Sequence, residues 1–565
     1  MNLRSPGARI RPGRALLLFV ALAAVSSGAA SAAVPSNSEL GAYADHLLSS
    51  AYPAGQPGAA VLIVKDGQTV LRKGYGMANL ELGVPVAPDM VFELGSITKQ
   101  FTATAILLLQ ERGQLRVEDD LTKYLPDYPT HGQTITLENL LTHTSGIPSY
   151  TGLPEWFPHM REDLKPADVI ALFKDKPLEF NPGEQWVYDN SGFFLLGAVI
   201  EKVSGKTYEQ FVEEEIFQKL GMAHTRYGHP EEITPRRASG YSKDDSGFRN
   251  ADFISMTQPY AAGSLMSTVD DLAIWGRALQ SEALLKKSSL DRMFADHKLK
   301  SGVPTQYGYG MGVHEIEGER MLSHGGDING FTANLTLVPG QRLFFALLSN
   351  NEASDPRPDA VALRVVAKAL GKPVEERKTV QLDTATLDEY AGVYRFDPQT
   401  ARMITREGSK LFAQRNGGRK QEITALAKDE FFYPDETRLR FRRDAQGKVT
   451  GVGFAPAFGP ASEGTKTNEP PPQERKEAKV DPAIYDAYVG DYELRPTFSI
   501  AVTREGDRIF AQATGQPKLE LFPESETRFF LKVVDAQIEF VRGVDGKVTG
   551  LILHQNGRDL PGKRK

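Results

Sequence analysis

The sequence predicts an α/β domain, in which an antiparallel sheet is flanked by helices and carries a helical subdomain, followed by two small antiparallel β-barrel domains. Two observations predict this arrangement. Strand patterns occur at both ends of residues 33–375 with helical patterns between them, so one sheet must be assembled from distant parts of the chain. Beyond residue 371, short strand patterns separated by Gly, Asp and Asn dominate, and they occur in two similar copies.

The elements of the first domain follow in chain order from local patterns. Two strands form a hairpin around the turn Lys65-Asp66-Gly67, with a helix before it. Between residues 116 and 220 the apolar residues recur with a helical period, which predicts the inserted helical subdomain. The expected helices are residues 39–50, 137–141, 167–173, 193–202, 268–279 and 360–370, and the expected strands are 59–64, 70–75, 310–315, 321–324, 332–338 and 343–348.

The two β modules are copies of one unit. The run TREGSKLFAQ at residues 405–414 returns 98 residues later as TREGDRIFAQ, and GKVTG occurs at both 447–451 and 546–550. Each copy is long enough for a small antiparallel barrel or sandwich, and we expect a barrel. The expected boundaries are residues 382–456 for the first barrel, 457–480 for a linker that contains Pro470-Pro471-Pro472, and 481–565 for the second barrel.

The N-terminus has the parts of a secretory signal peptide. Arginines precede an apolar run at residues 15–25, and Ala30-Ser31-Ala32 supplies the small residues that a signal peptidase recognises. We therefore expect residues 1–32 to be cleaved and the mature protein to be periplasmic or secreted, with no membrane span after signal removal. An uncleaved N-terminal anchor is the alternative.

The composition excludes several classes of partner. A formal net charge of −6, with no cluster of Lys and Arg outside the N-terminus, gives no electrostatic reason to expect nucleic acid or an anionic membrane. The chain contains no Cys and therefore no disulfide. Its ten histidines do not fall into metal-binding spacings, so we expect neither a metal nor a cofactor. A small peptide, amide or ester substrate fits this composition best.

The first candidate motif is Ser96-Ile97-Thr98-Lys99, which precedes a proline-free apolar run and predicts a buried helix that begins at Ser96. Three residues are nearly one helical turn, so the hydroxyl and the amine share a face at the positive end of the helix dipole. A buried lysine there has a lowered pKa and can accept a proton, which suits a nucleophilic serine. The alternative is a serine helix cap followed by an incidental lysine.

The second motif is Tyr188-Asp189-Asn190, set just before an apolar helix. A tyrosine between Lys99 and Ser96 would have its anion stabilised and could take the serine's proton. The Asn190 amide could bind a substrate carbonyl and hold Lys99. The alternative is a turn in which Asn190 caps the helix and Tyr188 packs.

The third motif is His324-Gly325-Gly326-Asp327, expected on a strand that leads into a glycine turn. The glycines would let a substrate lie against the strand edge, with His324 facing it, and a backbone N–H just beyond them could serve an oxyanion. A histidine before two glycines is otherwise part of a loop.

These three motifs, in this order, resemble the signature elements of the serine β-lactamase and penicillin-binding-protein superfamily. The resemblance covers residues 38–370 and points to the branch of class C β-lactamases, D-Ala-D-Ala carboxypeptidases, D-aminopeptidases and related esterases. The phrase Leu140-Leu141-Thr142-His143-Thr144-Ser145-Gly146 is also similar to segments of that branch, although we assign His143 no chemistry. The tandem modules resemble the lipocalin-like barrels that follow the catalytic domain in D-aminopeptidases.

The resemblance implies a role for each motif residue. Ser96 would be the acylated nucleophile, and Lys99 and Tyr188 would move its proton, with the choice of acceptor left open because the two titrate as a pair. The substrate would be bound by Asn190, His324, Gly325 and Gly326. The oxyanion hole would consist of the backbone N–H groups of Ser96 and Asp327.

One departure separates this chain from penicillin-hydrolysing members, which usually have Lys-Thr-Gly or Lys-Ser-Gly where His324-Gly325-Gly326 stands. A neutral histidine binds a substrate carboxylate less strongly than a lysine does. We therefore expect an extracytoplasmic serine hydrolase, a D-amino-acid peptidase, carboxypeptidase or esterase, with possible self-association through the C-terminal modules. The alternatives are a β-lactamase and a penicillin-binding sensor that acylates without turnover.

Overall fold

The structure is a computed structural model. It describes residues 34–565 except 154, 245, 317, 373–378, 397–400, 416–419, 434–436, 456–460, 470–476, 496–497, 515–517, 532–535, 544 and 556–557. The expected signal peptide, residues 1–32, and the three consecutive prolines of the expected linker lie outside the described residues. In the part of the chain that is described, no helix has the length and apolarity to cross a bilayer.

Six described strands form the antiparallel sheet of the first domain, in the order β10-β11-β12-β13-β1-β2. Their bounds are β1 Ala59–Lys65, β2 Gln68–Tyr75, β10 Gly312–Ile316, β11 Glu319–Ile328, β12 Phe331–Val338 and β13 Leu343–Ser349. Strand β1 pairs with β13 from Ala59 opposite Ser349 to Lys65 opposite Leu343. The two ends of the domain therefore meet in adjacent strands, which confirms the prediction of one sheet assembled from distant segments.

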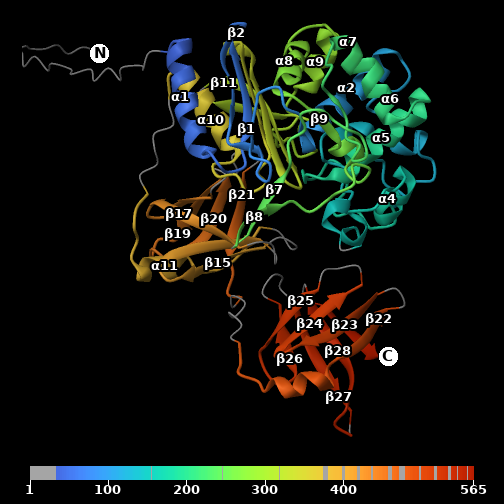
Figure 1. Cartoon of the computed structure of the whole chain (residues 1–565), viewed down its shortest axis with the longest axis vertical. Coiled ribbons are helices and arrows are strands. Elements are labelled where there is room, and N and C mark those ends of the chain that lie inside the picture. Colours follow the sequence, from blue (N-terminus) through green and yellow to red (C-terminus); the bar gives the residue numbers. More distant parts are fainter. Residues whose placement is uncertain are drawn as a thin grey trace, which may run out of the picture.

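Helices cover both faces of this sheet because its central strands are apolar on both sides. Val61 and Ile63 of β1 pack with the helices α1 (Asn37–Ala51) and α10 (Pro358–Ala369), which lie side by side in Figure 1. Ala60 and Leu62, whose side chains alternate with those, belong to the larger core on the opposite face. This core contains α2 (Thr98–Glu111) and α8 (Val269–Ala278).

The predicted helical subdomain lies against α2. Its helices are α3 Leu137–Leu141, α4 Pro166–Phe173, α5 Asn190–Ser204, α6 Tyr208–Val212 and α7 Gln218–Leu220, and α9 (Lys287–Met293) follows α8. Residues Thr98 to Leu109 of α2 are all buried, so this helix is enclosed by protein on every side. Its Phe101 ring stacks on Trp275 of α8 at 4.1 Å between centroids. Helix α2 is thus fixed between the sheet and the subdomain.

Two closed barrels come after this domain, each made of eight described antiparallel strands, as predicted. The strands of the first are β14 Gly392–Arg395, β15 Ala401–Glu407, β16 Lys410–Arg415, β17 Gln421–Ala427, β18 Glu430–Phe432, β19 Arg438–Arg443, β20 Val449–Ala455 and β21 Ser462–Lys466, preceded by the helix α11 Thr384–Tyr390. The strands of the second are β22 Gly490–Arg495, β23 Phe498–Glu505, β24 Arg508–Ala513, β25 Leu519–Pro523, β26 Arg528–Phe530, β27 Ala536–Arg542, β28 Val548–Gln555 and β29 Arg558–Arg564.

The barrels repeat each other in detail as well as in topology. The Tyr394 hydroxyl donates to the Tyr390 carbonyl at 2.7 Å, and Tyr492 donates to Tyr488 at the same distance. The expected linker, 457–480, begins too early, because Ser462–Lys466 forms β21 and closes the first barrel between β20 and β14. The linker was predicted from its prolines and charged residues, and these do not show that the residues just before them form the last strand of the barrel.

The expected glycine turn after His324 is also wrong, since β11 runs through Gly325 and Gly326 to Ile328 and pairs with β12 throughout. A Cβ on Gly326 would lie 2.0 Å from the Leu94 carbonyl oxygen, and one on Gly325 would lie 3.0 Å from an Asp359 carboxylate oxygen. Gly326 therefore allows the close approach of the Leu94 backbone to the strand, and Gly325 that of the Asp359 carboxylate.

We expect Gly326→Ala to lower the free energy of unfolding by about 2 kcal/mol or more, because the added methyl group cannot fit without a backbone shift. Urea or thermal unfolding of the full chain measures the change. The control is Gly152→Ala, where a Cβ meets nothing within 4 Å and no left-handed φ is required. Equal stability of the two variants would contradict the packing argument.

Candidate active site

Ser96 lies in a tight turn at the start of the buried helix. Residues Gly95–Ile97 form a 3₁₀ turn and α2 begins at Thr98, so the helix starts two residues later than expected. Gly95 has φ +51°, and a Cβ on it would lie 2.8 Å from the backbone nitrogen of Asp327. Only glycine allows both this conformation and this contact. The turn therefore holds Ser96 against strand β11.

Lys99 is fully buried beside the serine. Its Nζ lies 3.0 Å from Ser96 Oγ, 2.7 Å from Asn190 Oδ1 and 2.9 Å from the Ala262 carbonyl oxygen. Burial lowers its pKa to about 7, although the Asp189 carboxylate opposes this shift. A neutral amine donates two hydrogen bonds, which the amide and carbonyl oxygens accept, so its lone pair is left for the Ser96 hydroxyl.

Tyr188 completes the group, since its hydroxyl lies 2.7 Å from Ser96 Oγ. The expectation that its anion is stabilised is wrong. Burial raises the pKa of Tyr188 more than its hydrogen bond with Ser96 lowers it, and the Asp327 and Asp189 carboxylates raise it further. Tyr188 is therefore a neutral donor to the serine oxygen, and of the two groups Lys99 is the one that loses its proton near neutral pH.

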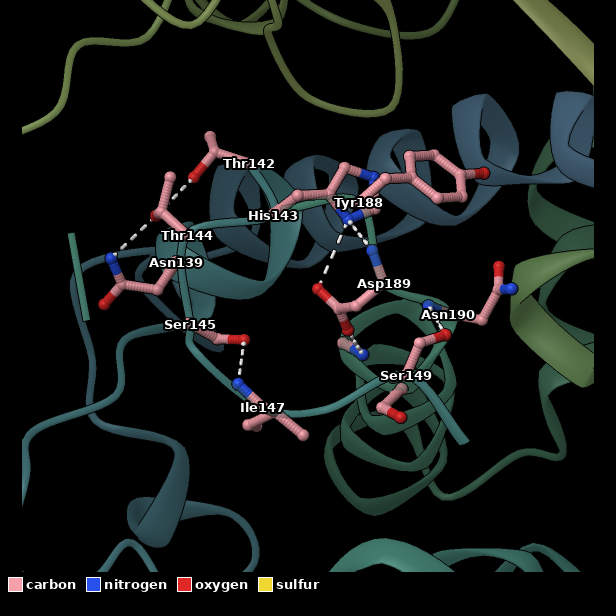
Figure 2. A network of polar contacts seen from close by, with 12 residues as sticks. Asn139, Thr142, His143, Thr144, Ser145, Ile147, Ser149, Tyr188, Asp189 and Asn190 are labelled. Carbon is pink, nitrogen blue, oxygen red and sulfur yellow. Dashed lines mark hydrogen bonds and ion pairs between the residues drawn. The ribbon is translucent and has the colours of Figure 1, made fainter. Parts of the chain in front are cut away.

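Asn190 is placed by the helix that follows it. The cap of α5 is Asp189, whose carboxylate accepts from the backbone N–H of Gly192 at 2.5 Å, and this leaves the Asn190 side chain free for the site. Besides the bond to Lys99, its amide donates to Thr151 Oγ1 at 3.0 Å. Its backbone N–H donates to Ser149 Oγ at 3.0 Å, as Figure 2 shows.

The structure brings the expected oxyanion residues together but turns His324 away. Asp327 lies on the part of β11 beyond the end of β10, next to Gly95 and Ser96. The His324 ring instead hydrogen bonds to Tyr307 Oη at 2.8 Å and to the Gly325 carbonyl oxygen at 2.6 Å. It is 8% exposed and does not line the cavity, so the expectation that it faces the substrate is wrong.

One cavity opens at Ser96. The site motifs contribute Gly95, Ser96, Asn190 and Asp327 to its walls, and the remaining walls are Tyr150, Thr151, Trp156, Ile254, Pro259, Ala262, Gly263, Ile328 and Asn329. Of these residues, the sequence drew attention only to Ala262 and Gly263, within a phrase similar to segments of the same branch, and gave them no role. The others come from segments far apart in the chain and belong to no motif. The cavity is polar at the nucleophile and apolar at Trp156, Ile254 and Ile328.

The side chains gathered at the site are a hydroxyl, an amine and a phenol. Among the described residues, no three His, Asp or Glu side chains are grouped so that they could hold a metal ion. Proton transfer and nucleophilic attack are the chemistry that the arranged side chains can perform.

Comparison with known proteins shows the family to which this chain belongs. A family model described as Beta-lactamase matches residues 48–369, more than half of the chain, and a model described as Domain of unknown function (DUF3471) matches residues 376–468 and 474–564. Penicillin-binding protein 4* of Bacillus subtilis is 26% identical over 518 residues, which is 88% of this chain and 93% of the relative.

Two solved structures are also similar. An octameric penicillin-binding protein homologue from Pyrococcus abyssi has a TM-score of 0.54 and 25% identity, and covers 75% of this chain and 99% of its own. A D-stereospecific amidohydrolase from Streptomyces sp. has a TM-score of 0.50 and 27% identity, and the match covers 59% of this chain and 98% of the Streptomyces chain. The first domain makes up less than 75% of the chain, so the similarity to the Pyrococcus protein extends beyond that domain.

The lowered pKa of Lys99 gives a pH prediction. As the pH rises through about 7, Lys99 loses its proton and can accept the one on Ser96, so covalent modification of Ser96 by an uncharged fluorophosphonate should rise and then level off. Mass spectrometry of the intact protein measures the rate. In Asn190→Asp the new carboxylate favours the ammonium, and the midpoint should move up by about 1–3 pH units. A rate that does not change with pH would contradict the assignment.

Proposed function

This chain belongs to the β-lactamase family of serine hydrolases, and we propose that it acts outside the cytoplasm on amide bonds of D-configured amino acids. The observation that carries the proposal is that the Lys99 amine and the Tyr188 phenol each lie within 3.0 Å of the Ser96 hydroxyl. They come from segments 92 residues apart in the sequence. The extracytoplasmic location is proposed from the signal-like residues 1–32.

The proposed reaction is acyl transfer. Ser96 Oγ attacks the substrate carbonyl carbon while its proton passes to the neutral Lys99 amine, and the developing oxyanion is bound by the backbone N–H groups of Ser96 and Asp327. Tyr188, hydrogen bonded to the same oxygen, gives its proton to the leaving amine and regains one from Lys99. Water then releases the acyl group by the same steps in reverse, and no cofactor takes part.

The shape and charge of the cavity support the substrate class. With His324 turned away, none of the three motifs supplies a cation to the described walls of the cavity, which disfavours the carboxylate that a penicillin presents. The apolar wall suits a hydrophobic side chain, and the Asp327 carboxylate, paired with Arg357, suits a substrate amino group. The Streptomyces protein named above, called a D-stereospecific amidohydrolase, has the same kind of fold.

A penicillin-binding protein that acylates without turnover is the second candidate. The similarity to penicillin-binding protein 4* over most of both chains favours it. The two candidates differ in the second step, because a sensor must retain the acyl group. A stable adduct with labelled penicillin, without release of product from any amide or ester, would favour the sensor.

We expect Ser96→Ala to lower kcat/KM for D-amino-acid amides by about 10³-fold or more, since the nucleophile is removed. A panel of D- and L-amino-acid amides, D-Ala-D-Ala peptides, short p-nitrophenyl esters and a chromogenic cephalosporin measures the substrate range. Faster turnover of the D-amides than of their L-isomers is the expected result. Faster turnover of esters or of the cephalosporin would replace the proposed substrate class, and an active Ser96→Ala protein would end the proposal.

Deletion of residues 382–565 should change substrate preference or the oligomeric state more than the acylation of Ser96. The pKa of Glu155, beside Trp156 in the cavity wall, is lowered against the effect of its burial, by Lys176 and also by Arg495 of the second barrel. Light scattering and the substrate panel measure the two changes. An unchanged number of subunits together with an unchanged substrate preference would count against a role for the barrels.

A further inference from the structure

Behind Tyr188 lies a chain of polar contacts that the proposed reaction does not use. We propose that His143, Tyr307 and His324 form a directed, uncharged hydrogen-bond chain that positions Tyr188 and strand β11 on opposite sides of the nucleophile. They are positioning residues and touch no substrate. The inference rests on the proposed function for the role that it gives Tyr188.

The chain runs across the site without interruption. The backbone N–H of Asp189 donates to His143 Nδ1 at 3.2 Å, and Figure 2 shows this contact. His143 Nε2 lies 3.3 Å from Tyr307 Oη, which lies 2.8 Å from His324 Nε2. His324 Nδ1 lies 2.6 Å from the Gly325 carbonyl oxygen. Both histidines and Tyr307 are buried.

Each end of the chain fixes the direction of every hydrogen bond in it. The Gly325 carbonyl can only accept, so His324 carries its proton on Nδ1, and Nε2 of the neutral ring must accept from the Tyr307 hydroxyl. The Tyr307 oxygen then accepts from His143 Nε2–H, which leaves His143 Nδ1 without a proton. That nitrogen meets the Asp189 N–H, which can only donate. The contact with the Asp189 N–H thus agrees with the direction that the Gly325 carbonyl requires.

A competing contact does not change this result. Asp189 Oδ2 lies 3.4 Å from His143 Nδ1, and a bond there needs a proton on Nδ1. That proton would oppose the shorter contact from the Asp189 N–H, and in a neutral chain the reversed direction would place the bare Nδ1 of His324 against a carbonyl oxygen. The reversed chain is therefore excluded at both ends.

The rings stay uncharged because of where they lie. Burial lowers the pKa of His143, against the effect of Asp189, and lowers that of His324 to about 3. The charged or titratable groups that act on the two rings are Asp189, Lys99 and His314, and His143 itself also acts on His324. Each ring therefore has one donor nitrogen and one acceptor nitrogen, which a directed chain requires.

The hydrogen-bond chain connects Tyr188 with strand β11, the two parts of the site whose positions the proposed reaction depends on. The His143 ring lies 4.3 Å from the Tyr188 ring, centroid to centroid. Its Nδ1 accepts a hydrogen bond from the backbone N–H of Asp189, the residue after Tyr188. At the other end, His324 fixes the Gly325 carbonyl, two residues before the Asp327 N–H that would bind the oxyanion. Loss of the central hydroxyl would free both sides at once.

The first test reads the two tautomers directly. The full chain is labelled with ¹⁵N-histidine, long-range ¹H–¹⁵N spectra are recorded at pH 7, and the two rings are assigned with His143→Gln and His324→Gln. We expect opposite tautomers, with the proton on Nε2 of His143 and on Nδ1 of His324, and both rings still neutral about one pH unit below an ordinary histidine pKa. The same tautomer in both rings, or a charged ring, would overturn the inference whatever the enzyme's substrate.

The second test uses Tyr307→Phe, which removes only the hydroxyl. The rate of Ser96 modification by the fluorophosphonate, and kcat for the amide substrate, should fall by about tenfold to a hundredfold while KM stays nearly constant, because the geometry at the nucleophile is lost and substrate binding is not. The matched control is Trp186→Phe, since the Trp186 ring packs on His143 and Tyr307 but its buried Nε1 has no hydrogen-bond partner among the described residues. We expect wild-type kinetics from this control.

The two proposals fail in different ways. If Tyr307→Phe retains the wild-type kcat, or if Trp186→Phe loses as much, the chain does not position the site and the inference is wrong. If the wild-type protein reacts with neither fluorophosphonate nor any substrate, the proposed function fails, and the tautomers still decide whether the chain exists.

Discussion

The burial of one amine determines how the site is built. Lys99 lies on a helix with no exposed face, and three oxygens from three separate segments surround its nitrogen. A pKa lowered from 10.5 to about 7 corresponds to a destabilisation on the order of 5 kcal/mol when the amine is charged. The unfolded chain binds this proton more tightly, so the destabilisation is fully present below about pH 7 and disappears as the pH rises toward 10.5. The rest of the domain must offset it by packing.

The packing that offsets it also sets the distances at the nucleophile. Gly95 touches the backbone of Asp327, and Gly326 touches the carbonyl of Leu94, so the turn that carries Ser96 and the edge of β11 interlock through residues without side chains. A methyl group at either position would separate the turn from the strand. Gly326 of the third motif thus acts through contact between two backbones, and the proposed oxyanion site, at the N–H groups of Ser96 and Asp327, depends on that contact.

Much of the fold could be predicted from the sequence because its signals are local. Alternating and helical patterns located β1, β2, β12, β13 and the helices α1, α5, α8 and α10. The repeat at residues 405–414 and 503–512 revealed the two barrels. The spacing of Ser96 and Lys99 predicted their contact, since one helical turn is short enough to be read from a pattern. Where two residues in contact are close in sequence, the sequence pattern was sufficient to predict the contact.

The errors arose where the deciding neighbour is distant in sequence. Gly325 and Gly326 suggested a turn, but the residues that demand glycine there are Asp359 and Leu94. His324 was expected to face the substrate, but its ring is hydrogen bonded to the Tyr307 hydroxyl and lies outside the cavity. The pKa of Tyr188 was judged from its polar neighbours, whereas burial outweighs them. The apolar cavity wall has no motif at all, because Trp156 and Ile254 meet only through the fold.

The neutral character of His324 links these features. A lysine at this position, as in many relatives with Lys-Thr-Gly, would place a second cation near Lys99 and lower the pKa of that amine further. A neutral histidine avoids this repulsion, and because an uncharged imidazole has one donor and one acceptor nitrogen, it can pass a hydrogen bond from Tyr307 to the Gly325 carbonyl. Under the proposed function, the departure from lysine removes a cation that would bind a substrate carboxylate. Under the proposed hydrogen-bond chain, the same histidine supports strand β11 from inside, so both proposals make substrate preference and the rigidity of the site depend on one side chain.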